Sequence, residues 1–249
     1  MRIPVAAILG AVIACAGAAG AAEVRVAVAA NFAVPMERVG AAFSAATGHT
    51  IKLTPGATGR FYSQIIAGAP FDVLIAADDD TPARLVAEGQ AVAGSNFTYA
   101  TGRLVLWSAQ PGLVDGQGAV LGSTRFAHLA IANPKLAPYG RAAMEVLRSR
   151  GLGESLAPRL VMGESIAQAY QFVVTGNAEL GFVALSQVAV PGKPASGSSW
   201  LVPPSLHSPI RQDAVRLKAG EGNPAATALL DYLKSDAARS VIQSYGYGF

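Results

Sequence analysis

The chain repeats one local pattern four times. A short apolar run rich in β-branched residues leads into a loop of small or hydroxyl-bearing residues, and the start of a helix follows. The runs are Val24–Ala29, Ile51–Thr54, Leu129–Ala132 and Leu160–Met162. The loops after them are, in the same order, Ala30-Asn31, Ala57-Thr58-Gly59, Pro138-Tyr139-Gly140 and Gly163-Glu164-Ser165. This alternation predicts an α/β fold with parallel strands.

Loops of this kind can hold an anion. A strand that leads into a helix N-terminus leaves backbone N–H groups without partners, and the helix dipole adds positive potential at the same place. In parallel sheets such loops gather at the carboxyl edge. Four of them, with no catalytic motif beside them, predict a cage for a small oxyanion. A deprotonated oxyanion only accepts hydrogen bonds, so N–H and O–H donors suit it better than carboxylates.

The first 22 residues have the composition of a signal peptide. Arg2 supplies a positive start, Ile3–Ala14 is apolar but too short to span a membrane, and small residues up to Ala22 offer cleavage sites. We expect residues 1–22 to be removed on export to the periplasm. Cys15, the single cysteine, lies in this segment, so the mature chain suits an oxidising compartment. The residues before Cys15 also resemble a lipoprotein cleavage site, which makes a lipid anchor at Cys15 the alternative.

The composition argues against several classes of protein. The formal charge is only +3 and 14% of residues are charged, without a long Lys/Arg cluster, so nucleic-acid or membrane-surface binding is not supported. His49, His128 and His207 lack the spacing of a metal site, and no Gly-x-Ser-x-Gly elbow is present. Asp78-Asp79-Asp80 fits the start of a helix better than a metal site. We therefore expect no enzyme activity, no cofactor and no direct metal-ion ligands.

Turn and cap signals divide the chain into two parts. We expect a helix with Pro35 in its first turn and Gly48 at its end. Further helices are expected after Thr81-Pro82, Asn223-Pro224 and Asp236. Tyr99–Trp107 is a long extended run, and Gly192–Pro204 is rich in Ser, Gly and Pro. We interpret both as crossings between two lobes, so that one lobe contains both chain ends and the other contains the middle.

Several motifs that occur in order along the whole chain carry a resemblance. They include Val28-Ala29-Ala30-Asn31-Phe32, Gly56-Ala57-Thr58-Gly59, Ala69-Pro70-Phe71-Asp72-Val73, Ala132-Asn133-Pro134, Ala137-Pro138-Tyr139-Gly140, Gly181–Ser186 and the closing Tyr245-Gly246-Tyr247-Gly248-Phe249. This set is similar to the periplasmic molybdate-binding proteins of ABC transporters. The resemblance covers the chain after the expected signal peptide.

The resemblance implies an α/β fold of the two-lobed periplasmic binding protein type (type II), with two crossover strands and a ligand cleft between the lobes. With the crossings above, lobe 1 would contain residues 23–101 and 206–249, and lobe 2 residues 102–205. The function implied is capture of molybdate or tungstate and its delivery to a membrane ABC permease. We expect the protein to act as a monomer.

The resemblance also implies the residues that hold the oxyanion. They are Ala30, Asn31, Thr58, Tyr139 and Ile166, with Ala57 and Ser165 as neighbours of lesser weight. Thr58 would donate through its hydroxyl, and Tyr139 and Ile166 through their backbone N–H groups. Family members often carry a serine where this chain has Asn31, and some use a tyrosine where it has Ala184.

Each of these residues has a simpler interpretation. Asn31 and Thr58 could cap helices, Tyr139 could belong to an ordinary turn, and Ile166 could be a core residue. Arg60 follows the Thr58 loop, but we expect it to be a solvated arginine on a helix face rather than a counter-ion.

Other solutes remain alternatives at this point. Sulfate, phosphate or another small oxyanion could bind to the same scaffold. An iron(III) carrier would need clustered tyrosines with His or carboxylate partners, and we expect Tyr245 and Tyr247 to lie away from the cleft.

Overall fold

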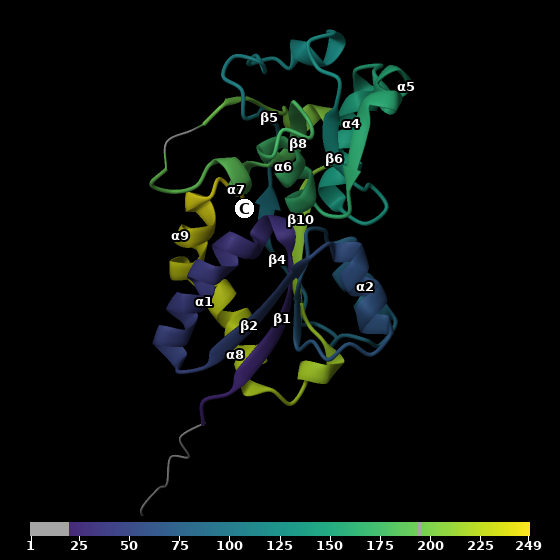
Figure 1. Cartoon of the computed structure of the whole chain (residues 1–249). Coiled ribbons are helices and arrows are strands. Elements are labelled where there is room, and N and C mark those ends of the chain that lie inside the picture. Colours follow the sequence, from purple (N-terminus) through teal and green to yellow (C-terminus); the bar gives the residue numbers. More distant parts are fainter. Residues whose placement is uncertain (1–19, 194–195) are drawn as a thin grey trace, which may run out of the picture.

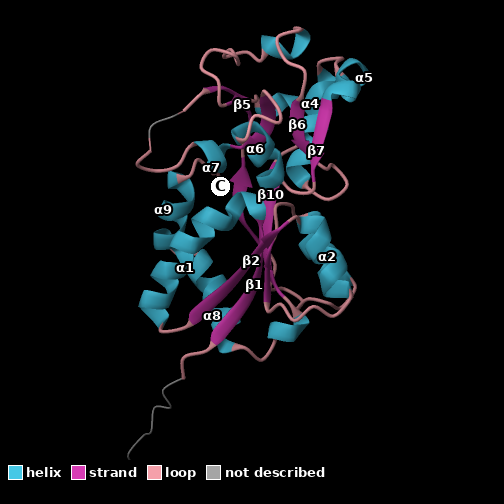
Figure 2. Cartoon of the chain, viewed as in Figure 1, coloured by secondary structure: helices cyan, strands magenta, loops and turns pink. Residues whose placement is uncertain are grey.

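The computed structural model describes residues 20–193 and 196–249. The strands are β1 (Glu23–Ala29), β2 (Thr50–Gly56), β3 (Val73–Ile75), β4 (Phe97–Gly102), β5 (Leu104–Ser108), β6 (Leu129–Ala132), β7 (Leu160–Gly163), β8 (Leu180–Ala184), β9 (Ser198–Leu201) and β10 (Ile210–Arg216). The α-helices are α1 (Ala33–Thr47), α2 (Thr58–Ile66), α3 (Asp80–Ala87), α4 (Pro138–Ser149), α5 (Gly153–Leu156), α6 (Ile166–Val174), α7 (Leu185–Val188), α8 (Pro224–Leu233) and α9 (Asp236–Ser244). Figure 2 shows these elements along the chain. The expected signal peptide, except residues 20–22, and Cys15 lie outside the described residues.

The strands form two sheets of the same design. Lobe 1 contains the sheet β2-β1-β3-β10-β4, and lobe 2 contains the sheet β7-β6-β8-β5-β9 (Figure 1). In lobe 1, β1 is parallel to β2 and β3, whereas β10 is antiparallel to β3 and β4. In lobe 2, β6 is parallel to β7 and β8, whereas β5 is antiparallel to β8 and β9.

The sheets are therefore mixed, and the expectation of purely parallel strands is corrected in this respect. β5 and β10 are the strands by which the chain enters each lobe from the other one. The parallel strands end at the edge that faces the opposite lobe, so an entering strand starts at that edge and must run against them. The four predicted units of strand, loop and helix are confirmed as β1–α1, β2–α2, β6–α4 and β7–α6.

The two crossings join the lobes close together. The first lies within the predicted run Tyr99–Trp107, where only Arg103 separates β4 from β5. The second lies between the end of β9 and the start of β10, slightly later than the predicted stretch Gly192–Pro204, two residues of which (194–195) are outside the described part. The exact lobe boundaries stay a prediction.

Alternation along the strands separates the core of lobe 1 into two layers. Val24, Val26 and Val28 of β1 pack with α1, α8 and α9, whereas Ala27 packs on the opposite face with α2 and α3. Figure 1 shows α1, α8 and α9 on one side of β1 and α2 on the other. The period of two in a strand produces this division. In the described part of the chain, no helix combines the length and apolar character needed to cross a membrane.

The predicted helix ends are confirmed with one shift. Gly48, at φ +75°, ends α1, and Asn223 caps α8 by accepting a hydrogen bond from the Ala225 N–H. However, α3 begins at Asp80 rather than after Thr81. The side chain of Asp78 accepts a hydrogen bond from the Thr81 N–H at 3.2 Å, so the acidic run satisfies the first turn and the helix starts earlier.

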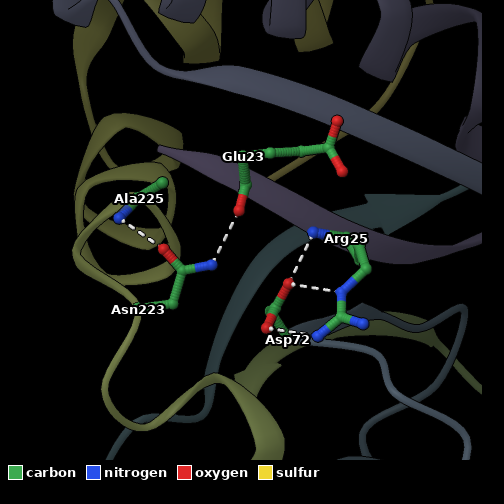
Figure 3. A network of polar contacts seen from close by, with 5 residues as sticks. All are labelled: Glu23, Arg25, Asp72, Asn223 and Ala225. Atoms are coloured by element: carbon green, nitrogen blue, oxygen red, sulfur yellow. Dashed lines mark hydrogen bonds and ion pairs between the residues drawn. The ribbon is translucent and has the colours of Figure 1, made fainter. Parts of the chain in front are cut away.

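A buried carboxylate ties the amino end of β1 to its neighbours (Figure 3). Asp72 accepts hydrogen bonds from the backbone N–H of Arg25 at 2.7 Å and from its guanidinium Nε at 3.3 Å. Its side chain is only 3% exposed, and the loss of this acceptor leaves a part-buried N–H of β1 without a partner. On the other side of β1, Asn223 donates to the carbonyl of Glu23 at 2.8 Å.

We expect Asp72→Ala to lower the free energy of unfolding by about 1–3 kcal/mol, because it leaves a part-buried backbone donor of β1 unsatisfied. Chemical denaturation of the ligand-free protein measures this effect. Asp231→Ala is the matched control, since Asp231 forms an exposed ion pair with Lys234 at 3.3 Å and should cost less than about 0.5 kcal/mol. Equal effects of the two substitutions would contradict the structural role of Asp72.

Candidate functional site

Three of the four predicted loops line one cavity between the lobes, and of the fourth unit only Ile166, the first residue of α6, reaches it. Its lining residues are Ala29, Ala30, Asn31, Gly56, Ala57, Thr58 and Ala77 of lobe 1, with Ala137, Pro138, Tyr139 and Ile166 of lobe 2. The five main candidate residues and Ala57 are all among them. Ser165 is not, because it lies one residue before α6 and its hydroxyl accepts a hydrogen bond from the Gln168 N–H at 3.3 Å as a helix cap.

The cavity is small and neutral. About 10 Å³ is open to the centre of a water-sized sphere, whereas pockets for organic ligands measure about 300–1,000 Å³. None of the lining residues carries a charged side chain. The cavity therefore suits a compact ligand that is held by backbone and hydroxyl groups.

Asn31 presents its backbone, rather than its side chain, as the group available to a ligand. It lies in the short 3₁₀ turn Ala30–Phe32 between β1 and α1. Its side-chain Nδ2 donates to Gln212 Oε1 at 2.9 Å and to the Tyr247 hydroxyl at 3.0 Å. It does not cap α1, which has no side-chain cap. The N–H groups at this helix start remain as the donors.

Thr58 is the first residue of α2 and is buried. Its hydroxyl oxygen accepts a hydrogen bond from the backbone N–H of Ala77 at 3.0 Å. A hydroxyl has one hydrogen to donate, and here that hydrogen is left over for a group in the cavity. Ala57, rather than Thr58, occupies the cap position of α2 and makes no side-chain cap bond.

The expected donors of lobe 2 lie in the first turns of two helices. Tyr139 follows Pro138 at the start of α4, and Ile166 is the first residue of α6. N–H groups in a first turn have no carbonyl partner within their helix. Ile166 is also buried against the core of lobe 2, so its core interpretation and its role as a backbone donor are compatible.

Glycines allow these helix starts to approach the strands. A Cβ atom on Gly140 would collide with the carbonyl of Ala132 at the end of β6. On Gly163 it would lie 2.7 Å from the backbone nitrogen of Ala169 in α6. A side chain at either position would push the helix away from its strand, so both glycines set the position of the cavity wall.

A buried polar network lies beside the cavity, and most of it was missed by the sequence analysis. Its members are Asn31, Tyr99, Tyr139, Ser186, Gln212 and Tyr247. Each of them is at most 5% exposed. Burial raises the pKa of Tyr99, Tyr139 and Tyr247 well above the ordinary value, so their hydroxyls stay neutral. The network places no charge next to the cavity.

The expected position of Tyr247 is wrong. Its hydroxyl donates to the carbonyl of Asn31 at 2.8 Å and lies 3.0 Å from the hydroxyl of Ser186. The C-terminal segment reaches this place because Gly248 pairs with Thr101 beside the first crossing. Tyr245, by contrast, is buried in the core of lobe 1 and does not line the cavity.

Besides the buried network, other contacts also join the lobes around the cavity. The N–H of Gly59 donates to the carbonyl of Leu136 at 2.9 Å, Arg60 forms an ion pair with Glu164 at 2.5 Å, and Arg141 forms one with Asp78 at 2.9 Å. The side chain of Arg60 is 56% exposed and does not line the cavity, as expected of a solvated arginine. Within residues 20–193 and 196–249, no group of three or more His, Cys, Asp or Glu residues could hold a metal ion.

Comparisons with known proteins agree with this architecture. The molybdate-binding protein ModA of Azotobacter vinelandii is 62% identical over 231 residues, which cover 93% of this chain and 92% of the relative. ModA of Rhodobacter capsulatus is 55% identical over 229 residues, covering 92% and 89%. The solved structure of the Azotobacter vinelandii periplasmic molybdate-binding protein matches with a TM-score of 0.89 and 40% identity, covering 91% of this chain and 99% of that one.

The family model described as bacterial extracellular solute-binding protein matches residues 24–248, nearly the whole described chain. Together with the two lobes, the two crossings and the cavity between them, this match places the chain: it belongs to the family of bacterial extracellular solute-binding proteins.

Proposed function

We propose that this protein captures molybdate, or tungstate, in the periplasm and delivers it to an ABC permease. The observation that carries this proposal is the cavity in which helix starts of both lobes meet without any charged side chain among the lining residues. The two relatives named molybdate-binding proteins, which span most of this chain, support the choice of oxyanion.

Neutral donors can hold a dianion in such a place. Hydrogen bonds to a charged group contribute about 1.5–3 kcal/mol each, and the dipoles of the helices at the cavity add to them. The proposed donors are the backbone N–H groups of Ala30, Asn31, Tyr139 and Ile166 and the hydroxyl of Thr58. Ala57 contributes to the wall. Release requires no buried ion pair to be broken, because none of these donors is charged.

Closure of the two lobes would complete the site. Asn31 and Thr58 belong to lobe 1, whereas Tyr139 and Ile166 belong to lobe 2. A ligand that touches both pairs favours the closed arrangement by its difference in affinity for the closed and open states. A cavity of fixed size then distinguishes oxyanions by their radius, since sulfate accepts the same kinds of hydrogen bonds.

The remaining parts of the proposal follow from the sequence. Residues 1–22 act as a signal peptide, with a lipid anchor at Cys15 as the alternative. The exported protein works as a monomer without a cofactor, and catalyses no reaction. Lobe 1 is formed by residues 23–101 and 206–249, and lobe 2 by residues 102–205.

We expect molybdate and tungstate to stabilise the mature protein strongly, while sulfate and phosphate do little. A micromolar ligand at millimolar concentration adds about 4 kcal/mol to the free energy of unfolding. Thermal unfolding with each oxyanion, and with iron(III), measures this at equal ligand concentration. A shift with sulfate as large as the shift with molybdate would show that the site does not select molybdate.

We expect Thr58→Val to weaken molybdate binding by about 1.5–3 kcal/mol, because it removes a hydroxyl donor to a charged ligand. Thr58→Ser is the matched control, since it keeps both the donor and the acceptor for the Ala77 N–H. Titration calorimetry measures both affinities. The role of the hydroxyl is refuted if the Val variant, with its fold intact, binds as tightly as the Ser variant.

We expect Gly59→Ala to weaken molybdate binding without destabilising the ligand-free protein. A Cβ atom there would lie 3.0 Å from the carbonyl oxygen and 3.1 Å from the Cα of Leu136 in the opposite lobe. In the open protein the same change only improves helix propensity within α2, by about 1 kcal/mol. Gln64→Ala, an exposed change on α2, is the control. If both variants bind like the wild type, the lobes do not need this close approach.

A further inference from the structure

We propose that Gln212 is a positioning residue that locks the two halves of the oxyanion site into one geometry and thereby sets its selectivity. This inference rests on the proposed function. Gln212 lies in β10 and is fully buried. It does not line the cavity, yet its side chain contacts a lining residue from each lobe.

Both polar atoms of the Gln212 side-chain amide form hydrogen bonds. Its Oε1 accepts hydrogen bonds from Asn31 Nδ2 and from the Tyr99 hydroxyl, each at 2.9 Å, and both partners belong to lobe 1. Its Nε2 donates to the hydroxyl of Tyr139 in lobe 2 at 3.1 Å. One side chain therefore links the residue that supplies an anion donor in lobe 1 to the residue that supplies one in lobe 2.

Asn31 is held from a second direction as well. Its carbonyl accepts hydrogen bonds from the Tyr247 hydroxyl of lobe 1 and the Ser186 hydroxyl of lobe 2, each at 2.8 Å. Side chain and main chain of Asn31 are thus both fixed by partners that include the opposite lobe. Movement of either lobe would change the orientation of the adjacent anion donors.

The first crossing encloses the link between the lobes. A Cβ atom on Gly102, the last residue of β4, would collide with the Tyr139 hydroxyl and with Gln212 Nε2. The chain passes over this hydrogen bond so closely that only a glycine fits. A buried donor or acceptor without a partner is costly, so the arrangement is satisfied at one relative position of the lobes.

This geometry distinguishes the network from the exposed contacts at the rim. Exposed ion pairs such as Arg60–Glu164 contribute little free energy to fixing the distance between the lobes. Water screens their charges, and their long side chains adapt to small displacements. A buried amide between two fixed partners does not adapt in this way. The rim contacts help to hold the lobes together, whereas Gln212 determines the distance between the lobes in the closed arrangement.

Tyr139→Phe tests the link most cleanly. It removes the hydroxyl that Gln212 binds and keeps the backbone N–H that is proposed to contact the anion. The loss of one such hydrogen bond corresponds to about a 2- to 12-fold change in molybdate affinity. We expect a loss in this range, and a smaller loss for sulfate, so that the ratio of the two affinities falls. Tyr99→Phe is the matched control, because it removes a hydroxyl from the same amide within lobe 1, and the affinity ratio should change much less.

Gln212→Met provides a second test, because methionine has a similar volume but cannot form the hydrogen bonds of the glutamine amide. The double variant Gln212→Met/Tyr139→Phe should lose no more molybdate affinity than the more affected of the two single variants, because both substitutions remove the same hydrogen bond between the lobes. Calorimetric titration of wild type and variants with molybdate and with sulfate gives all these values. Wild-type protein that does not bind molybdate refutes the proposed function. Wild-type protein that binds selectively, with Tyr139→Phe unchanged in affinity and in selectivity, overturns the role of Gln212 alone.

Discussion

A backbone N–H group at the start of a helix has no carbonyl partner within that helix, and this fold brings several such starts to one cavity. The sheets put the carboxyl ends of β1, β2, β6 and β7 at edges that face each other, and each strand leads into a helix there. Gly140 and Gly163 let two of these helices approach their strands closely. We propose that an anion, or water, in the cavity supplies the missing partners of these N–H groups, so that the helix starts which form the fold also create the need for a ligand.

Two sets of contacts across the cavity have different physical character. The pairs Arg60–Glu164 and Asp78–Arg141 lie at the rim, where at least one partner of each is well exposed. The network around Gln212 is buried and neutral, because burial raises the pKa of its tyrosines. We propose that an anion bound by neutral donors next to this neutral network meets no fixed counter-charge, and that its selection depends on the size of the closed cavity.

Much of the fold and of the cavity lining could be predicted from the sequence, because both depend on local patterns. The run Val24–Ala29 before Ala30-Asn31 shows a strand, a loop and a helix start in consecutive residues. Gln212 gives no such signal, since it is a single polar residue in a strand and its partners are distant in sequence. Tyr247 was misplaced for the same reason: the pairing of Gly248 with Thr101 brings the C-terminus to the crossing, and no local pattern encodes that pairing.

We propose that the oxyanion site exists only when the two lobes close. Small-angle X-ray scattering of the mature protein, with and without saturating molybdate, tests this most directly, because closure of two lobes shortens the molecule. We expect the radius of gyration to fall on addition of molybdate and to stay at the ligand-free value with sulfate at the same concentration. An unchanged radius of gyration at a molybdate concentration that calorimetry shows to be saturating would contradict the claim.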